Sequence, residues 1–175
     1  MANRSLRTIC LVLVTFLILV STVVSAEARY LQTNTSLYIA ADRSLSAWFK
    51  AGSNVNERSP GIVSSGTLHS NTSLYIASNR SLSAWFKAGT IAAFRPDGSV
   101  SSGTLHSNVS LYIASNRSLS TWFKAGSQIQ TREDGSVSSG TLLSRTSLYI
   151  NPQRSQSRWF DAGTTLTFRP DGSVI

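Results

Sequence analysis

A 37-residue repeat constrains this chain more than any other feature of its sequence. The segment SLYIASNRSLSAWFKAG at 73–89 returns at 110–126 with one difference, Thr121 in place of Ala84. A unit this short rarely buries its apolar residues alone, so the copies are expected to stack or to circle together as one domain over 27–175. The Leu-Tyr-Ile motif recurs every 37 residues and divides the chain into four copies, 28–64, 65–101, 102–138 and 139–175.

The composition of each copy predicts β-strands. Ser, Thr, Gly, Tyr, Trp, Ile and Val are frequent, and no apolar spacing of 3.6 residues is present. The segment RPDGSV, at 95–100 and 169–174, orders Pro, Asp and Gly as a tight turn favours, and a second turn is expected at 78–81. We therefore expect an all-β fold of four tandem 37-residue β-hairpin repeats in an open stacked sheet or solenoid. A closed four-fold ring or propeller is the alternative.

Comparison of the copies separates inward from outward positions. The stretch before the Pro-Asp-Gly turn has an apolar middle residue in every copy, and its neighbours are mostly polar, which is the alternation of a half-buried strand. By the same alternation the following arginines, Arg58, Arg95, Arg132 and Arg169, are expected to face outward. The other expected core columns are Leu31, Leu68, Leu105 and Leu142; Leu37, Leu74, Leu111 and Leu148; Ile39, Ile76, Ile113 and Ile150; Phe49, Phe86, Phe123 and Phe160; and Val63, Val100, Val137 and Val174.

The last copy departs from the others in its polarity. It has Arg145 for Asn, Gln156 for Leu, Arg158 for Ala and Asp161 for Lys. Polar substitutions at the end of an array are typical of a capping repeat. A closed ring has no end to cap, so this pattern favours the open stack.

The N-terminal segment predicts a secretory signal peptide over 1–26. Two arginines precede the apolar run 9–24, and small residues then offer cleavage after Ala26 or Ala28. The run is short for a membrane-spanning helix, although an uncleaved anchor is the alternative. We expect an exported protein of the periplasm, the cell surface or the extracellular space, with no transmembrane segment after cleavage. Its only cysteine, Cys10, lies in this segment, so the mature chain has no disulfide.

Two stretches of the second copy resemble sequences of a known type. FRPDGSVSSGTL at 94–105, with FKAGT at 86–90 before it, resembles the MORN-like β-hairpin repeats of exported bacterial proteins. The resemblance covers 28–175. It implies β-hairpin repeats and a bacterial cell-envelope protein, and it carries over no catalytic residue and no activity.

The sequence does not indicate an enzyme. His69 and His106 share one repeat position, but the other copies have Gln32 and Leu143 there. The mature chain has no thiol, its turn aspartates are accounted for by the turns, and its serines have no evident base. We therefore expect no catalytic residue, no cofactor and no metal site.

The recurring aromatic residues are the best candidates for a binding site. Each Trp precedes a Phe, so a Phe in the core places its Trp on the opposite face of the strand. An exposed column of Trp and Tyr beside Arg would form a platform for sugar rings or an anionic polymer. The alternative is a sheet covered on both faces, with Trp and Tyr in a second core layer. The candidate residues are Trp48, Trp85, Trp122, Trp159, Tyr38, Tyr75, Tyr112, Tyr149, Arg43, Arg80, Arg117 and Arg154.

Charge bears on the partner. From Glu27 onward the chain has 14 Lys and Arg against 8 Asp and Glu, a net charge of +6 that favours anionic partners. It has no basic run, and no nucleic acid is expected.

The expected role is a non-catalytic structural or interaction module at the cell envelope or outside the cell. The alternative is carbohydrate or anionic-polymer binding through the Trp, Tyr and Arg residues. Expected partners are a polysaccharide, another envelope protein, or a second copy through the sheet edges. Asn-X-Ser/Thr sequons, which glycosylation would use in a eukaryotic secreted chain, stand at Asn34, Asn71, Asn79, Asn108 and Asn116.

Overall fold

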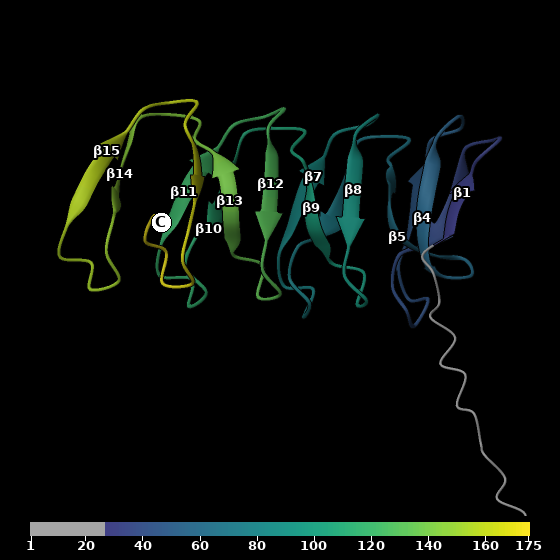
Figure 1. Ribbon diagram of the computed structural model, residues 1–175, viewed down its shortest axis with the longest axis horizontal. Coiled ribbons are helices and arrows are strands. Elements are labelled where there is room, and N and C mark those ends of the chain that lie inside the picture. Colours follow the sequence, from purple (N-terminus) through teal and green to yellow (C-terminus); the bar gives the residue numbers. More distant parts are fainter. Residues whose placement is uncertain (1–26) are drawn as a thin grey trace, which may run out of the picture.

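The computed structural model describes residues 27–175, and the predicted signal peptide lies outside them. Figure 1 shows an elongated array in which the repeats follow one another along its length in sequence order. The described residues form strands and connections without any helix, so none of them makes a helix that is long and apolar enough to cross a membrane. The sheets stay open, which confirms the all-β stack of hairpin repeats and makes the ring or propeller alternative wrong.

One layer of the array is a continuous antiparallel sheet, called here the main sheet. Its strands are hydrogen-bonded in the order β1-β4-β5-β8-β9-β12-β13-β16. Short turns join β4 to β5, β8 to β9 and β12 to β13, so that each repeat extends the sheet by two strands. These strands are β1 (Glu27–Tyr30), β4 (Asn54–Ser59), β5 (Ile62–Thr67), β8 (Ile91–Phe94), β9 (Val100–Thr104), β12 (Gln128–Thr131), β13 (Val137–Thr141) and β16 (Thr165–Thr167).

The other layer consists of one β-hairpin from each repeat. The last three hairpins are separate two-stranded sheets, and the first is joined to the main sheet by a single parallel pair, Tyr38 with Ile62. Within every hairpin the Phe of the second strand faces the Thr or Val that opens the first. The hairpins are β2 (Thr35–Tyr38) with β3 (Ser46–Phe49), β6 (Thr72–Tyr75) with β7 (Ser83–Phe86), β10 (Val109–Tyr112) with β11 (Ser120–Phe123), and β14 (Thr146–Tyr149) with β15 (Ser157–Phe160).

Backbone hydrogen bonds tie each of the first three hairpins to the repeat that follows it. The amide of Ala41, in the first hairpin turn, donates to the carbonyl of Pro96 in a main-sheet turn at 2.7 Å. The same bond recurs from Ser78 to Glu133 and from Ser115 to Pro170, at 2.8 Å each. Because these bonds skip from one repeat to the next, they hold the repeats in a fixed stacking order.

The core lies between the two layers and follows the predicted columns. Phe49, Phe86 and Phe123 are fully buried, and the Phe49 ring meets Phe94 of the next repeat edge to face, with centroids 6.1 Å apart. The Leu31 and Val63 columns are buried throughout. Residues of the predicted columns are incompletely buried only in the first and last repeats. Leu37 is partly buried, Phe160 is only half-buried and Ile150 is 38% exposed.

The arginines before the main-sheet turns do not lie where strand alternation places them. Arg95 is half-buried, and its guanidinium donates to the Val100 carbonyl at 2.7 Å and to the Thr131 carbonyl of the next repeat. Arg132 makes the equivalent bonds to Val137 and Phe168. The register shifts just before each arginine, which breaks the alternation used for the outward prediction. These side chains join neighbouring repeats instead of pointing into solvent.

Candidate binding face

The outward side of the hairpin layer carries the predicted aromatic residues, and we call it the aromatic face. In the first hairpin, Trp48 lies opposite Ser36 and Tyr38 lies opposite Ser46. The other hairpins repeat this cross-strand arrangement. The aromatic face therefore consists, in each hairpin, of one Trp, one Tyr and two Ser: Ser36, Tyr38, Ser46 and Trp48; Ser73, Tyr75, Ser83 and Trp85; Ser110, Tyr112, Ser120 and Trp122; and Ser147, Tyr149, Ser157 and Trp159.

The tryptophans are exposed in all four hairpins. Their exposed fractions are 53, 52, 52 and 60% from Trp48 to Trp159. Tyr38 and Tyr75 are also exposed, while Tyr112 and Tyr149 are half-buried. Of the two arrangements that the sequence left open, the four tryptophans adopt the exposed column and do not form a second core layer. Soluble proteins rarely expose large apolar patches, and those that they do expose generally mark interaction sites. The column of four exposed indoles is therefore a candidate interaction site.

Strand alternation explains why the tryptophans point outward. The residues on either side of Trp85, Ala84 and Phe86, are buried, and successive side chains of a strand point to opposite faces. Phe86 fills the core under a glycine of the main sheet, Gly103, where an added Cβ would lie 2.6 Å from the Phe86 ring. The core therefore fixes the phenylalanine, and the phenylalanine fixes the outward direction of the tryptophan beside it.

The stacking of the repeats sets the spacing of the tryptophans. Each repeat adds two strands to the main sheet, and neighbouring strands lie about 4.8 Å apart, so that successive hairpins advance by roughly 10 Å. This advance is close to the length of two sugar rings in an extended polysaccharide chain. The aromatic face is thus a series of equivalent positions at regular intervals along the array.

The four predicted arginines lie at the turns of the hairpins and mainly link one hairpin to the next. All four adopt positive φ values of 54 to 59°, uncommon for residues other than glycine. The Arg117 guanidinium donates to the Ser81 hydroxyl of the preceding hairpin at 2.7 Å, and Arg154 does the same to Ser118 at 3.1 Å. Arg43, in the first hairpin, instead lies over the Tyr38 ring, 5.6 Å from its centroid. The arginines therefore border the tyrosine end of the aromatic face, with their charge partly engaged in these links.

Lysines border the opposite end of the aromatic face, and our sequence reasoning did not single them out. Lys50, Lys87 and Lys124 each follow a Trp by two residues, and all three are exposed. The signal was present in the repeat motif WFK, which places one lysine directly after each of these strands. The strand ends at the Phe, and the lysine after it is tied to the main sheet, since the Lys50 amide donates to the Thr67 carbonyl at 2.9 Å.

The fourth hairpin has a different border. Asp161 replaces the lysine, and Arg145 replaces the asparagine found at this position in the other copies. Their side chains form an ion pair of 3.6 Å, and the Arg145 guanidinium also lies over the Trp159 ring, 5.1 Å from its centroid. Arg158 stands where other hairpins have buried Ala or Thr, and it lies over Phe160.

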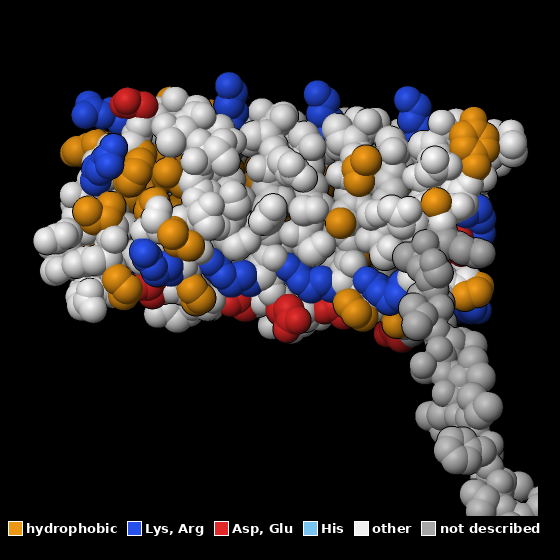
Figure 2. Space-filling view, viewed as in Figure 1, with side chains coloured by type: hydrophobic (Ala, Val, Ile, Leu, Met, Phe, Trp, Pro, Cys, Tyr) orange, Lys and Arg blue, Asp and Glu red, His pale blue; other side chains and the backbone are white. Residues whose placement is uncertain are grey.

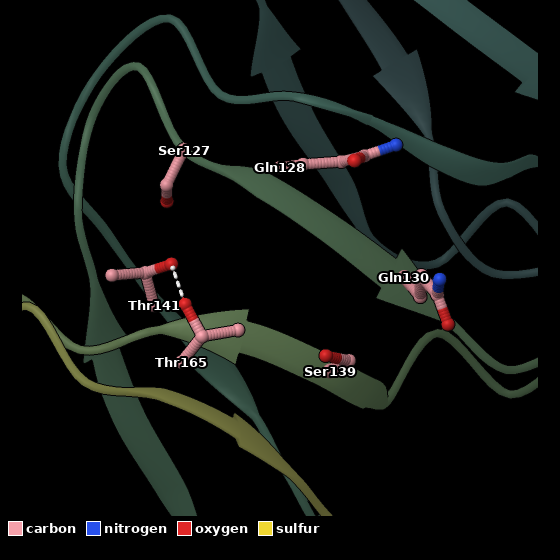
Figure 3. Close-up of a pocket in the computed structure, with 6 residues that line it drawn as sticks. All are labelled: Ser127, Gln128, Gln130, Ser139, Thr141 and Thr165. Carbon is pink, nitrogen blue, oxygen red and sulfur yellow. Dashed lines mark hydrogen bonds between the residues drawn. The ribbon is translucent and has the colours of Figure 1, made fainter.

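The outward side of the main sheet is the second broad surface of the protein, and Figure 2 shows it as largely uncharged. Basic side chains are spaced along its upper edge, and basic and acidic ones gather along its lower edge. Its chemistry differs from that of the aromatic face, since hydroxyls and amides predominate. A shallow hollow of about 360 Å³ lies on it between β12, β13 and β16, with one hydrogen bond of 2.8 Å between Thr141 and Thr165 (Figure 3). The hollow is lined by Ser127, Gln128, Gln130, Ser139, Thr141 and Thr165.

Residues 27–175 contain no group of three or more His, Cys, Asp or Glu side chains arranged to hold a metal ion. His69 and His106 are exposed, and the nearest polar contact of His106 is a weak one with Asn71, 3.5 Å between nitrogens.

Comparison with protein families, with curated proteins and with solved structures finds no match to this chain. The resemblance to MORN-like repeats stays a prediction.

Proposed function

We propose that this protein is an exported, non-catalytic interaction module that binds an extended carbohydrate polymer along its aromatic face. The observation that carries the proposal is the column of four tryptophans, each more than half exposed. An indole ring packs on the apolar face of a sugar ring and donates one N–H, and its rigidity keeps the entropic cost of binding low. The serines across each hairpin add hydroxyls that can exchange hydrogen bonds with a sugar.

The regular spacing supports a polymer over a single sugar. One Trp and one Tyr recur with every repeat, so each pair of sugar rings would meet the same set of side chains. Weak contacts repeated along one chain raise the affinity without any single deep pocket. The expected location, at the cell envelope or outside the cell, is part of this proposal, since polysaccharides are abundant there.

Tryptophan fluorescence of the mature chain tests the proposal. We expect red-shifted emission that acrylamide quenches readily, and a change in that emission when a soluble polysaccharide is titrated. Trp85→Ala and Trp122→Ala should each weaken binding by about tenfold, as the loss of a central aromatic contact does at other interfaces. Ile91→Ala is the matched control, because Ile91 is 65% exposed but lies on the main sheet.

Two results would contradict the proposal. Blue-shifted emission that resists quenching would mean that the aromatic face is covered in solution. Native, well-exposed tryptophans that respond to no polysaccharide would favour the other expected role, a structural module without a sugar ligand.

A further inference from the structure

We propose that the polymer is an acidic polysaccharide with one anionic group in every two sugars, held across the first three hairpins. The inference rests on the proposed function and identifies its ligand more closely. It is drawn from the lysines at one end of the aromatic face and from their replacement in the fourth hairpin.

The lysines share the spacing of the tryptophans. Two residues of chain span at most about 7 Å, so each lysine Cα lies within that distance of the Cα of its Trp, just beyond the end of the strand. The amides of Lys50, Lys87 and Lys124 all donate to a Thr carbonyl of the main sheet, at 2.9 to 3.0 Å. This shared bond fixes their backbone, so a cation recurs roughly every 10 Å beside the Trp column.

Loops of the same shape hold these positions. The side-chain oxygen of Asn34 accepts the amide of Ala51, one residue after Lys50, at 2.8 Å. Asn71 and Asn108 make the same bond to Ala88 and Ala125. The asparagine bond is thus a second hydrogen bond, at the residue after each lysine, that holds the backbone from which the lysine side chain extends.

The lysine charges are not neutralised within the described residues. The ion pairs there involve Arg29, Arg80 and Arg145, and none involves a lysine. The opposite end of the aromatic face differs, because Arg80 lies 3.7 Å from Asp42 and donates to Ser44. An anionic group on the ligand is thus best accommodated at the lysine end, and one such group per repeat matches one per disaccharide.

The fourth hairpin limits the length of the site. Asp161 puts a negative charge where the other hairpins have a lysine, and Arg145 both pairs with it and covers one side of Trp159. Because this pair leaves no unpaired cation at the border, an anionic group of the polymer has no partner there. Three hairpins, and so about three disaccharides, form the expected footprint.

The test compares two soluble ligands of equal length by calorimetry and by tryptophan fluorescence. One is a hyaluronan hexasaccharide, with one carboxylate per disaccharide, and the other is a neutral chitin hexasaccharide. We expect the acidic ligand to bind more tightly, with an affinity that falls as salt is added. The variant Lys50→Gln, Lys87→Gln, Lys124→Gln should lose about tenfold in affinity for the acidic ligand, two- to threefold per exposed ion pair, and nothing for the neutral one.

A gain-of-function variant provides the matched control for footprint length. Asp161→Lys with Arg145→Asn recreates the border of the other hairpins, and it should strengthen binding of an acidic octasaccharide but not of the hexasaccharide. Both variants change exposed side chains only, so circular dichroism and the thermal midpoint should stay those of the wild type.

The outcomes separate this inference from the proposed function. Equal binding of both ligands, unchanged in the triple lysine variant, would overturn the inference and leave the proposed function standing. Absence of binding by both ligands and by other soluble polysaccharides would overturn both. Acidic binding that needs the lysines but is unchanged in Trp85→Ala would contradict the aromatic face itself, and with it this inference.

Discussion

A glycine without a turn role shows how closely the two layers approach each other. Gly103 lies inside β9, where an added Cβ would come within 2.6 and 2.8 Å of two Phe86 ring carbons. Gly66 and Gly140 stand in the same relation to Phe49 and Phe123. The glycine at this position is therefore required by packing, and not by its backbone freedom.

Gly103→Ala should destabilise the protein by about 1–3 kcal/mol, because the fully buried Phe86 ring has no free space to move into. Thermal unfolding followed by circular dichroism measures the loss. Ser102→Ala is the control, since Ser102 is the neighbouring residue on the outward side of β9. An equal midpoint for the two variants would contradict the tight contact.

At the scale of the element, the main-sheet turns rely on their aspartates. The Asp97 carboxylate accepts the Ser99 amide at 2.8 Å and the Ser99 hydroxyl at 2.7 Å. Burial alone would raise the pKa of Asp97, but hydrogen bonds from Ser78 and Ser99 hold that pKa below its usual value. The pKa of Asp134 is lowered in the same way, against burial, by Ser115 and Ser136. Ser78 and Ser115 belong to hairpin turns of the same two repeats, so the aspartates also join the layers.

The lowered pKa values predict acid sensitivity. An unfolded aspartate has a pKa of about 3.9, so below that pH the unfolded chain binds more protons than the native one. The contribution of these turns to the free energy of unfolding is therefore complete above that pH and lost as the pH falls through the native pKa. Denaturant unfolding between pH 6 and pH 2 measures this contribution. In Asp97→Asn the free energy of unfolding should fall less steeply with decreasing pH than in the wild type, and in Ser78→Ala the slope should be reduced in part. Ser70→Ala, which changes an exposed serine outside the turn, should keep the slope of the wild type.

At the scale of the whole molecule, the two outer strands of the main sheet bear on self-association. The first strand of the main sheet, β1, pairs with β4, and the last strand, β16, pairs with β13. Within the described residues, each of these two strands therefore has one edge without a partner strand. A second copy that continued the array in register would place Arg29 of β1 where the interior has glycine, because Val55 pairs with Gly66 on one side and with Arg29 on the other. The Arg29 side chain, which pairs with Glu57 at 3.0 Å, would then meet Phe160 of the neighbouring copy.

We therefore expect residues 27–175 to resist the end-to-end association that the sheet edges suggested. At the other end of the array Arg158 covers the Phe160 ring, 5.3 Å from its centroid, so Arg29→Gly combined with Arg158→Ala should clear both sides of the contact and produce oligomers. Sedimentation velocity at several concentrations distinguishes the cases. A wild-type chain that already forms long oligomers, or a double variant that stays monomeric, would contradict this role for the arginines.

The alternation of side chains could be predicted from sequence because it is a local property. In the strand segment Ala-Trp-Phe, an inward Phe places the Trp before it on the outward side, because successive side chains of a strand point to opposite faces. Comparison of the copies likewise located the core columns, since buried positions tolerate few polar residues. The period of 37 residues predicted equal units, and the structure decided that they stack in an open array instead of closing into a ring.

Only the tertiary structure decided whether the outward side would be covered. Burial of Trp85 depends on whether another layer packs over its hairpin, and such contacts join residues far apart in the chain. The same holds for Arg95, which reaches Thr131 in the next repeat, and for Gly103, whose neighbour Phe86 lies in the other layer. Local pattern therefore sets which way a side chain points, while the meeting of distant segments decides what it touches.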